Sequence, residues 1–150
     1  VNTSRGSIAR SISYLDKESD SISHENNFVE CLRFAFLAKK SKAAILDLTK
    51  WSEKLASISR DQQKDFLSYC SYLIREAMLI SYSSKNLGSF SSNTDFKIDK
   101  LSPFVHSSNL IEIISLIEDC HYSISRNVNS KIVFTNFAIS LTKLINKEEV

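Results

Sequence analysis

Residues that break helices are scarce in this sequence, which has only 2 Gly and 1 Pro among 150 residues. Proline removes a backbone donor from a helix interior and glycine destabilises it, so this scarcity favours long helices. Two glycines also cannot form a phosphate-binding loop, which excludes nucleotide sites of that kind. No segment reads as a strand. The sequence therefore predicts an all-α fold, a bundle of about five to six helices.

Long hydrophobic runs and an excess of one charge are also missing. No stretch approaches the roughly 18 uncharged apolar residues of a membrane span, and the first residues lack the apolar core of a signal peptide. Lys and Arg number 19 against 17 Asp and Glu, and the two signs are interspersed, so no basic stripe marks a DNA groove. We expect a cytoplasmic protein that contacts neither membrane nor DNA directly.

Cysteine is present in an odd and widely spaced set, Cys31, Cys70 and Cys120, each among apolar residues. This pattern is typical of reduced, buried thiols rather than of a disulfide framework. No cofactor and no metal site is expected.

Apolar residues at three- and four-residue spacing predict helices over 4–16, 23–40, 42–57, 60–83, 109–125 and 130–146. Ser59 and Gln62 form a capping box before the helix 60–83, whose wide apolar surface predicts packing on several sides. Periodicity is lost over 84–103, which we interpret as a loop held down by its aromatic residues. Trp51 is predicted in the core, with interface packing as the alternative.

Histidine is the residue type most suggestive of chemistry here. His121 lies beside Cys120 and near Glu118, but neighbouring helical residues diverge by about 100° and no second ligand stands at metal spacing, so a partly buried structural role is favoured. His24 and His106 lie in polar, boundary-like contexts, where a capping or solvent-facing role is expected. We expect no enzyme.

Lys39 and Lys40 end the predicted helix 23–40, and Lys42 stands at the start of the next one. They could contact phosphate, but cations at a helix C-terminus are favoured by the helix dipole. A solvated helix end is the preferred interpretation.

The most informative segment runs from Arg126 to Lys131. Asn127 tolerates the left-handed conformation that ends a helix, and Asn129 can cap the helix that follows. The segment therefore predicts a tight elbow between the last two helices.

This Arg-Asn-x-Asn-x-Lys pattern, carried by Arg126, Asn127, Asn129 and Lys131, resembles the C-terminal region of bacterial delta-prime clamp-loader subunits, where such an elbow precedes a final apolar helix. Residues 6–10 are similar to the sensor 2 opening in the lid of clamp-loader ATPase modules. Ala9 stands where the nucleotide-sensing arginine of the active ATPase subunits would be, so ATP sensing is not transferred to Arg10.

The resemblance implies that residues 1–18 end a lid subdomain and residues 19–150 form a helical collar, within a longer subunit of DNA polymerase III. Such a collar holds its subunit in the ring that loads the sliding clamp during DNA replication. The implied partners are the delta and ATPase (gamma/tau) subunits, with DNA and clamp reached only through the full complex. Interface candidates are Tyr69, Tyr72, Tyr122 and Lys131, and two opposite apolar sides are expected because a ring member has two neighbours.

Three alternatives stay open. In the first, the chain is the collar of the ATPase subunit, which shares this architecture. In the second, it is an unrelated helical adaptor with one apolar groove for a peptide helix. The third, an enzyme built around His121 and Glu118, requires a deep pocket with a shifted pKa and ranks last.

Overall fold

The computed structural model describes residues 2–82 and 97–148, with side chains from residue 19 onward. Within these ranges the chain is all-helical and has no strand, which confirms the predicted fold class. The elements are α1 (Asn2–Ala38), α2 (Ala43–Ala56), α3 (Arg60–Tyr82), the short 3-10 helices η1 (Ile98–Lys100) and η2 (Ser102–Phe104), α4 (Leu110–Ser125) and α5 (Ser130–Ile145).

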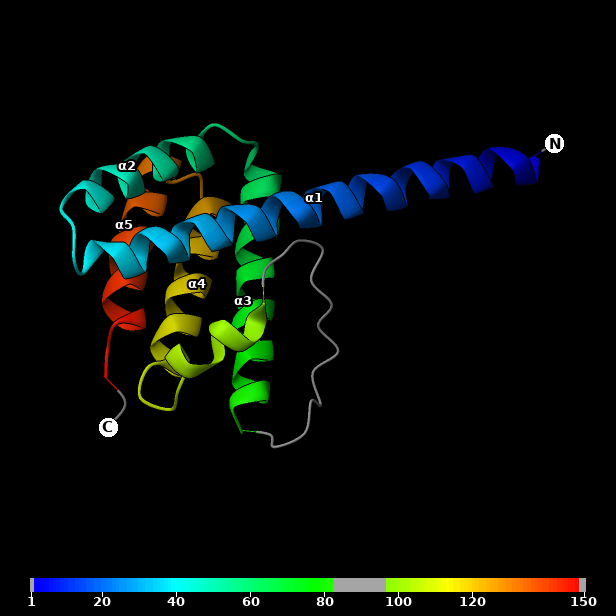
Figure 1. Cartoon of the computed structure of the whole chain (residues 1–150). Helices are drawn as coiled ribbons and strands as arrows, with labels where there is room; N and C mark the ends of the chain where they lie inside the picture. Colours follow the sequence, from blue (N-terminus) through cyan, green and yellow to red (C-terminus); the bar gives the residue numbers. More distant parts are fainter. Residues whose placement is uncertain (1, 83–96, 149–150) are drawn as a thin grey trace.

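The helices form a bundle from which one helix projects (Figure 1). α4 and α5 form a hairpin, α3 packs beside α4, and α2 packs beside α5. The second half of α1 crosses the bundle and contacts α2, α3 and α5, while its first half extends beyond the other helices. α3 also contacts η1 and η2, so the predicted packing on several sides is confirmed.

The first helix differs from the sequence-based expectation. Two helices were predicted, over 4–16 and 23–40, but α1 runs without interruption from Asn2 to Ala38. Serine and aspartate between residues 17 and 22 are favoured at helix caps, but each lowers the stability of a helix interior only slightly, and no proline there removes a backbone hydrogen bond. The predicted turn is therefore wrong.

The other four α-helices begin and end within one residue of the predictions. The predicted loop over 84–103 contains η1 and most of η2, and its residues 84–96 lie outside the described part of the chain. Phe104, next to this segment, packs against Phe36 in a tilted arrangement with ring centroids 4.5 Å apart. An aromatic contact thus ties the segment to α1.

Aromatic side chains form the centre of the core. Trp51 of α2 lies 5.9 Å from Phe66 of α3 and 6.0 Å from Phe137 of α5 between ring centroids. Such pairs contribute about 1 kcal/mol each beyond the area that they bury. The Trp51 indole N–H donates to the Asn27 carbonyl at 2.9 Å, so its polar atom is satisfied. The predicted core position of Trp51 is confirmed.

Candidate interaction surfaces

The elbow, residues 126–131, connects α4 to α5 through a Schellman motif. Asn127 has a φ of 61°, in the left-handed region that Asn tolerates better than most residues. Its N–H donates to the Ile124 carbonyl at 3.2 Å, and the Val128 N–H donates to the Ser123 carbonyl at 3.1 Å. These two bonds satisfy carbonyls that a helix end otherwise leaves open.

The elbow also starts the next helix. The Asn129 side-chain oxygen accepts a hydrogen bond from the Ile132 N–H at 3.3 Å, as expected for an N-cap. The predicted roles of Asn127 and Asn129 are both confirmed. The turn is therefore specified by local chemistry on both sides.

A buried amide joins the elbow to the turn between α2 and α3. Gln63 is 1% exposed, and its side-chain N–H donates to the carbonyls of Leu55 and Ile58, each at 3.0 Å. Its side-chain oxygen accepts from the Ser130 hydroxyl at 3.0 Å. Ser59 accepts from the Gln62 N–H at 3.2 Å, which confirms its predicted role at the start of α3.

Arg60 makes the second link between these two turns. Its guanidinium donates to the Ile124 carbonyl at 3.1 Å and to the Val128 carbonyl at 3.0 Å. Hydrogen bonds from a charged donor are worth more than neutral ones, about 1.5–3 kcal/mol each when shielded from water. Arg60 and Gln63 therefore hold the elbow at one fixed angle to α3.

Sequence reasoning missed both anchors as site residues. Gln63 carries a usable signal, because it stands in the apolar stripe that continues through Phe66, Leu67 and Cys70. A polar residue in such a position is buried and needs partners. Nothing in the sequence indicates that Arg60 reaches 64 residues along the chain.

Several side chains of the elbow end face solvent. Tyr122 is 61% exposed, and the Arg126 guanidinium carbon lies 5.3 Å from the centre of its ring. Lys131 pairs with Glu53 at 3.1 Å, and both side chains are more than half exposed. Val128 and Ile132 are exposed as well. Exposed Tyr and Arg beside aliphatic side chains are typical of protein interfaces.

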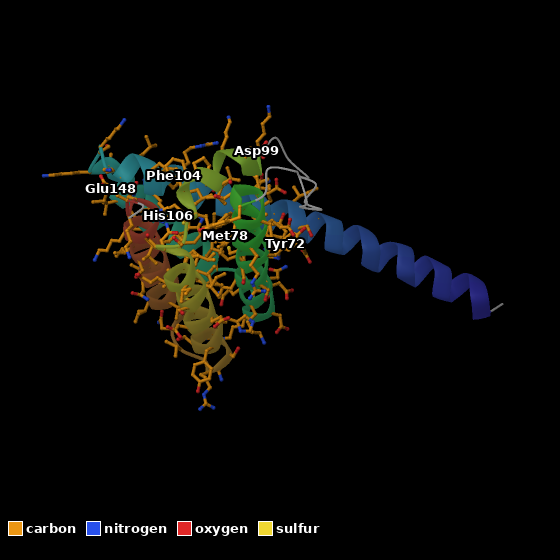
Figure 2. The ribbon with its side chains drawn as sticks, turned by 90° about the horizontal axis from the view of Figure 1, so that it is seen from below. Tyr72, Met78, Asp99, Phe104, His106 and Glu148 are labelled. Carbon is orange, nitrogen blue, oxygen red and sulfur yellow. The ribbon has the colours of Figure 1, made fainter. Side chains whose placement is uncertain are left out.

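The tyrosines of α3 form a separate region. Tyr69 donates its hydroxyl to a Glu25 carboxylate oxygen at 3.1 Å, and its ring lies 6.2 Å from that of Tyr72. Burial, and then the charge of Glu25, raise the pKa of Tyr69 above its ordinary value. Figure 2 shows the more exposed Tyr72 on the side of the bundle where α1 leaves it. The four interface candidates thus lie in two groups, Tyr69 with Tyr72, and Tyr122 and Lys131 at the elbow end.

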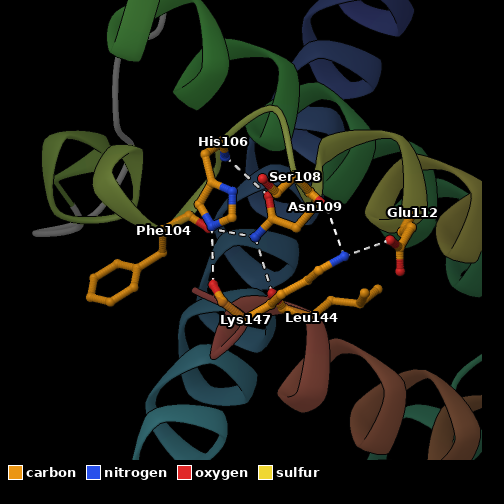
Figure 3. A network of polar contacts seen from close by, with 7 residues as sticks. All are labelled: Phe104, His106, Ser108, Asn109, Glu112, Leu144 and Lys147. Carbon is orange, nitrogen blue, oxygen red and sulfur yellow. Dashed lines mark hydrogen bonds and ion pairs between the residues drawn. The ribbon is translucent and has the colours of Figure 1, made fainter. Parts of the chain in front are cut away.

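At the opposite end of the hairpin, a polar network holds the end of α5 (Figure 3). Asn109 is fully buried and donates to the carbonyls of Phe104 at 2.8 Å and Leu144 at 3.0 Å. Its side-chain oxygen accepts from the His106 N–H at 3.0 Å. The His106 ring nitrogen Nε2 lies 3.0 Å from the Lys147 carbonyl, so this nitrogen carries the proton in the neutral ring. We call these five residues the C-terminal network.

Two histidines are buried although the sequence indicated capping or solvent-facing positions. His106 is 5% exposed and His24 is 7% exposed. His24 packs against the rings of Phe66 and Tyr69, each 6.1 Å away. Burial lowers the pKa of His24, partly opposed by the charges of Asp20 and Asp65. The solvent-facing prediction is wrong because tertiary packing, which local polarity does not show, covers both rings.

His121 lines a hollow of about 270 Å³ between α3 and α4. The other lining residues are Leu67, Ser68, Ser71, Arg75, Ile117 and Glu118. The His121 side chain is half-buried, as predicted, and the hollow is open because Arg75 and Glu118 are exposed. In the described part of the chain, no three His, Cys, Asp or Glu side chains gather as metal ligands would.

The three cysteines are free and buried, which confirms the prediction of reduced thiols. Burial, aided by Asp119, raises the pKa of Cys120 to about 12, and burial raises the pKa of Cys31 and Cys70 as well. These thiols therefore stay protonated at neutral pH. A protonated thiol is a poor nucleophile.

No family model, curated protein or solved structure matches the chain. Among the described helices, none combines the length and the apolar character that crossing a membrane requires. The class that the fold defines is an all-helical bundle with a fixed elbow.

Proposed function

We propose that the chain is a non-catalytic oligomerisation domain, the collar of a delta-prime type clamp-loader subunit, which holds its subunit in the ring that loads the sliding clamp. The observation that carries the proposal is the elbow. Its sequence resembles the Arg-Asn-x-Asn-x-Lys pattern of this family, carried here by Arg126, Asn127, Asn129 and Lys131. Hydrogen bonds from Arg60 and to Gln63 fix this turn.

The elbow end has the properties that an assembly domain needs. Its backbone is held by hydrogen bonds to a neighbouring turn, so its surface keeps one shape. A preformed surface loses little conformational entropy on binding. Tyr122, Arg126 and Lys131 are exposed, so a neighbouring subunit can reach them.

The second group of candidates, Tyr69 and Tyr72, supports a second contact. It lies on α3, near the place where α1 leaves the bundle. A member of a closed ring touches two neighbours through different surfaces. We therefore assign the elbow end to one neighbour and the Tyr72 side to the other, with the delta and ATPase subunits as partners.

Co-purification tests the proposal. The tagged chain is mixed with the delta and ATPase subunits of the same organism, and the mass of the eluted complex is measured by light scattering. We expect a complex that is lost when Tyr122→Glu and Lys131→Glu are combined, because both changes place negative charge in the contact. Lys54→Glu is the matched control, since Lys54 also pairs with a carboxylate at 3.1 Å and is 56% exposed.

No complex, either with this chain or with the longer subunit that the resemblance implies, would overturn the proposal. A complex with the delta subunit in which this chain takes the ATPase subunit's position would instead support the collar of that subunit. The adaptor alternative has one observation in its favour, the apolar groove between α2 and α5. It predicts that changes in the groove, and not at the elbow, abolish partner binding.

A further inference from the structure

An apolar groove of about 300 Å³ lies between α2 and α5. At one end it approaches the Lys131–Glu53 ion pair, because Ser52 and Thr135 line it. Its floor includes Leu48 and Ala138, which are buried, and its walls include Ile45 and Ile139, which are 53% and 47% exposed. Lys143 is the only charged side chain that lines it. Two large aliphatic side chains that flank one apolar groove indicate a binding surface.

The dimensions of the groove suit a helix. The lining residues span positions 45–52 of α2 and 135–143 of α5, which is about two helical turns, or about 10 Å. A helix that packs across two neighbouring helices places side chains at i, i+3 or i+4, and i+7 into such a groove. Ile132, 65% exposed and seven residues before Ile139, extends the apolar surface along α5.

Lysines stand among the lining residues and next to them in the sequence, and the acidic Glu53, beside Ser52, is already paired with Lys131. Lys39, Lys40 and Lys42 follow the lining residue Ala38 directly, and all three are exposed. Within the described part of the chain, neither these lysines nor Lys143 takes part in an ion pair. One lysine in the groove, with three more exposed lysines following the lining residue Ala38 in the sequence, favours a ligand that carries carboxylates beside its apolar residues.

We infer that this groove binds an acidic amphipathic helix of a partner protein, with aliphatic residues against Ile45 and Ile139 and with carboxylates facing Lys143 and the 39–42 lysines. The inference goes beyond the proposed function, because it concerns a further surface of the domain and applies to the adaptor alternative as well. It assigns a role to the lysines beyond that of a solvated helix end.

Peptide binding tests the inference without any clamp-loader subunit. The probe is a labelled 18-residue peptide with Leu at helical a and d positions and Glu at the flanking positions, and its partner peptide has Lys in place of every Glu. Fluorescence anisotropy with the whole chain measures both affinities. We expect the Glu peptide to bind about tenfold tighter or better, with an affinity that falls as salt rises.

Variants locate the site. Ile139→Ser and Lys143→Glu are each expected to weaken the Glu peptide about tenfold, because both residues line the groove. Ile111→Ser is the matched control, since Ile111 is an exposed isoleucine (75%) on α4 that does not line the groove. Circular dichroism verifies that each variant is folded.

Three outcomes would overturn the inference. Equal affinity for the Glu and Lys peptides removes the role of the lysines, and unchanged binding by Ile139→Ser removes the groove. Tight binding to vesicles of phosphatidylcholine and phosphatidylglycerol, without peptide binding and abolished by Lys143→Glu, assigns the surface to an anionic membrane. Because the peptide assay needs neither the delta nor the ATPase subunit, its failure leaves the co-purification result unaffected.

Discussion

At the elbow end of the α4–α5 hairpin the buried amide of Gln63 donates to two backbone carbonyls, and at the opposite end the buried amide of Asn109 does the same. The ends differ in what surrounds these amides. The anchors of the elbow, Arg60 and Gln63, belong to the first turn of α3, and Tyr122, Arg126 and Lys131 are exposed. In the C-terminal network, the side chains of Asn109 and His106 form hydrogen bonds with other members of the network instead.

We expect this difference to separate residues that stabilise the fold from residues that bind a partner. Side chains that satisfy buried backbone groups contribute to the folded state, whereas exposed side chains beside them contribute little to it. Changes in the C-terminal network should therefore act on stability. Changes to the exposed residues of the elbow should act on partner binding. The predictions below test this division.

The largest effect is expected at Asn109. Asn109→Ala removes three hydrogen bonds at a fully buried site and leaves the Phe104 and Leu144 carbonyls without this donor. We expect the free energy of unfolding to fall by about 3 kcal/mol, measured by urea denaturation. Asn136→Ala, an exposed change on α5, is the control and should stay within about 0.5 kcal/mol. Equal effects of the two changes would contradict the assigned role of Asn109.

Gln63 tests the role of a buried side-chain amide at the elbow end. Gln63→Met keeps the length of the side chain but removes its bonds to Leu55, Ile58 and Ser130. We expect a loss of about 2 kcal/mol in the free energy of unfolding, since some of the freed groups can reach water. Lys50→Met, at an exposed position of α2, is the control. A loss no larger than that of the control would show that the two ends are not held alike.

A smaller effect is expected at Asn127, whose φ is 61°. Asn127→Val places a β-branched residue in the left-handed region and should destabilise the protein by about 1 kcal/mol or more. Asn127→Gly should be nearly neutral, because glycine adopts this conformation readily. Thermal unfolding of both variants measures the difference. If Val and Gly behave alike, the turn does not depend on this conformation.

The smallest effect is expected from pH at His24, because Asp20 and Asp65 oppose the effect of burial. The folded-state pKa of His24 is lowered, so the unfolded chain binds this proton more tightly. Stability is therefore full above the unfolded pKa of about 6.5 and falls as the pH drops through it. Urea denaturation at pH 7.5 and 5.5 measures this loss. His24→Leu should lessen it, and an unchanged loss would assign acid sensitivity to other groups.

His24 belongs to neither end of the hairpin. It lies where α1 packs on α3, against Phe66 and Tyr69. Acid destabilisation through His24 should therefore weaken the elbow end and the C-terminal network together. Amide hydrogen exchange at pH 5.5 and 7.5 would show equal changes in protection at both ends.

Much of the fold could be predicted from the sequence, because apolar spacing along α2, α3, α4 and α5 is regular and few residues can interrupt a helix. The continuity of α1 could not, since serine and aspartate between 17 and 22 are favoured at helix caps but lower the stability of a helix interior only slightly. At the elbow, Asn127 and Asn129 were predictable because their roles depend on neighbours within a few residues.

The anchors of the site could not be predicted in the same way. Arg60 meets Val128 across 68 positions of the chain, and His106 meets Lys147 across 41. The residues close to each partner in the sequence do not indicate such long-range pairs. The residues beside His24 and His106 in the sequence are polar, but both rings are buried in the fold. The polarity of the sequence neighbours therefore gave the wrong prediction.

The sequence by itself determined the helical class, the limits of four helices and the geometry of the elbow, because these depend on periodicity and on hydrogen bonds within a single turn. Only the tertiary structure decided which polar side chains are buried, how the elbow is held by Arg60 and Gln63, and that α2 and α5 enclose a groove. The physical reason is that these features arise from contacts between helices, whose partners are chosen when apolar faces pack together.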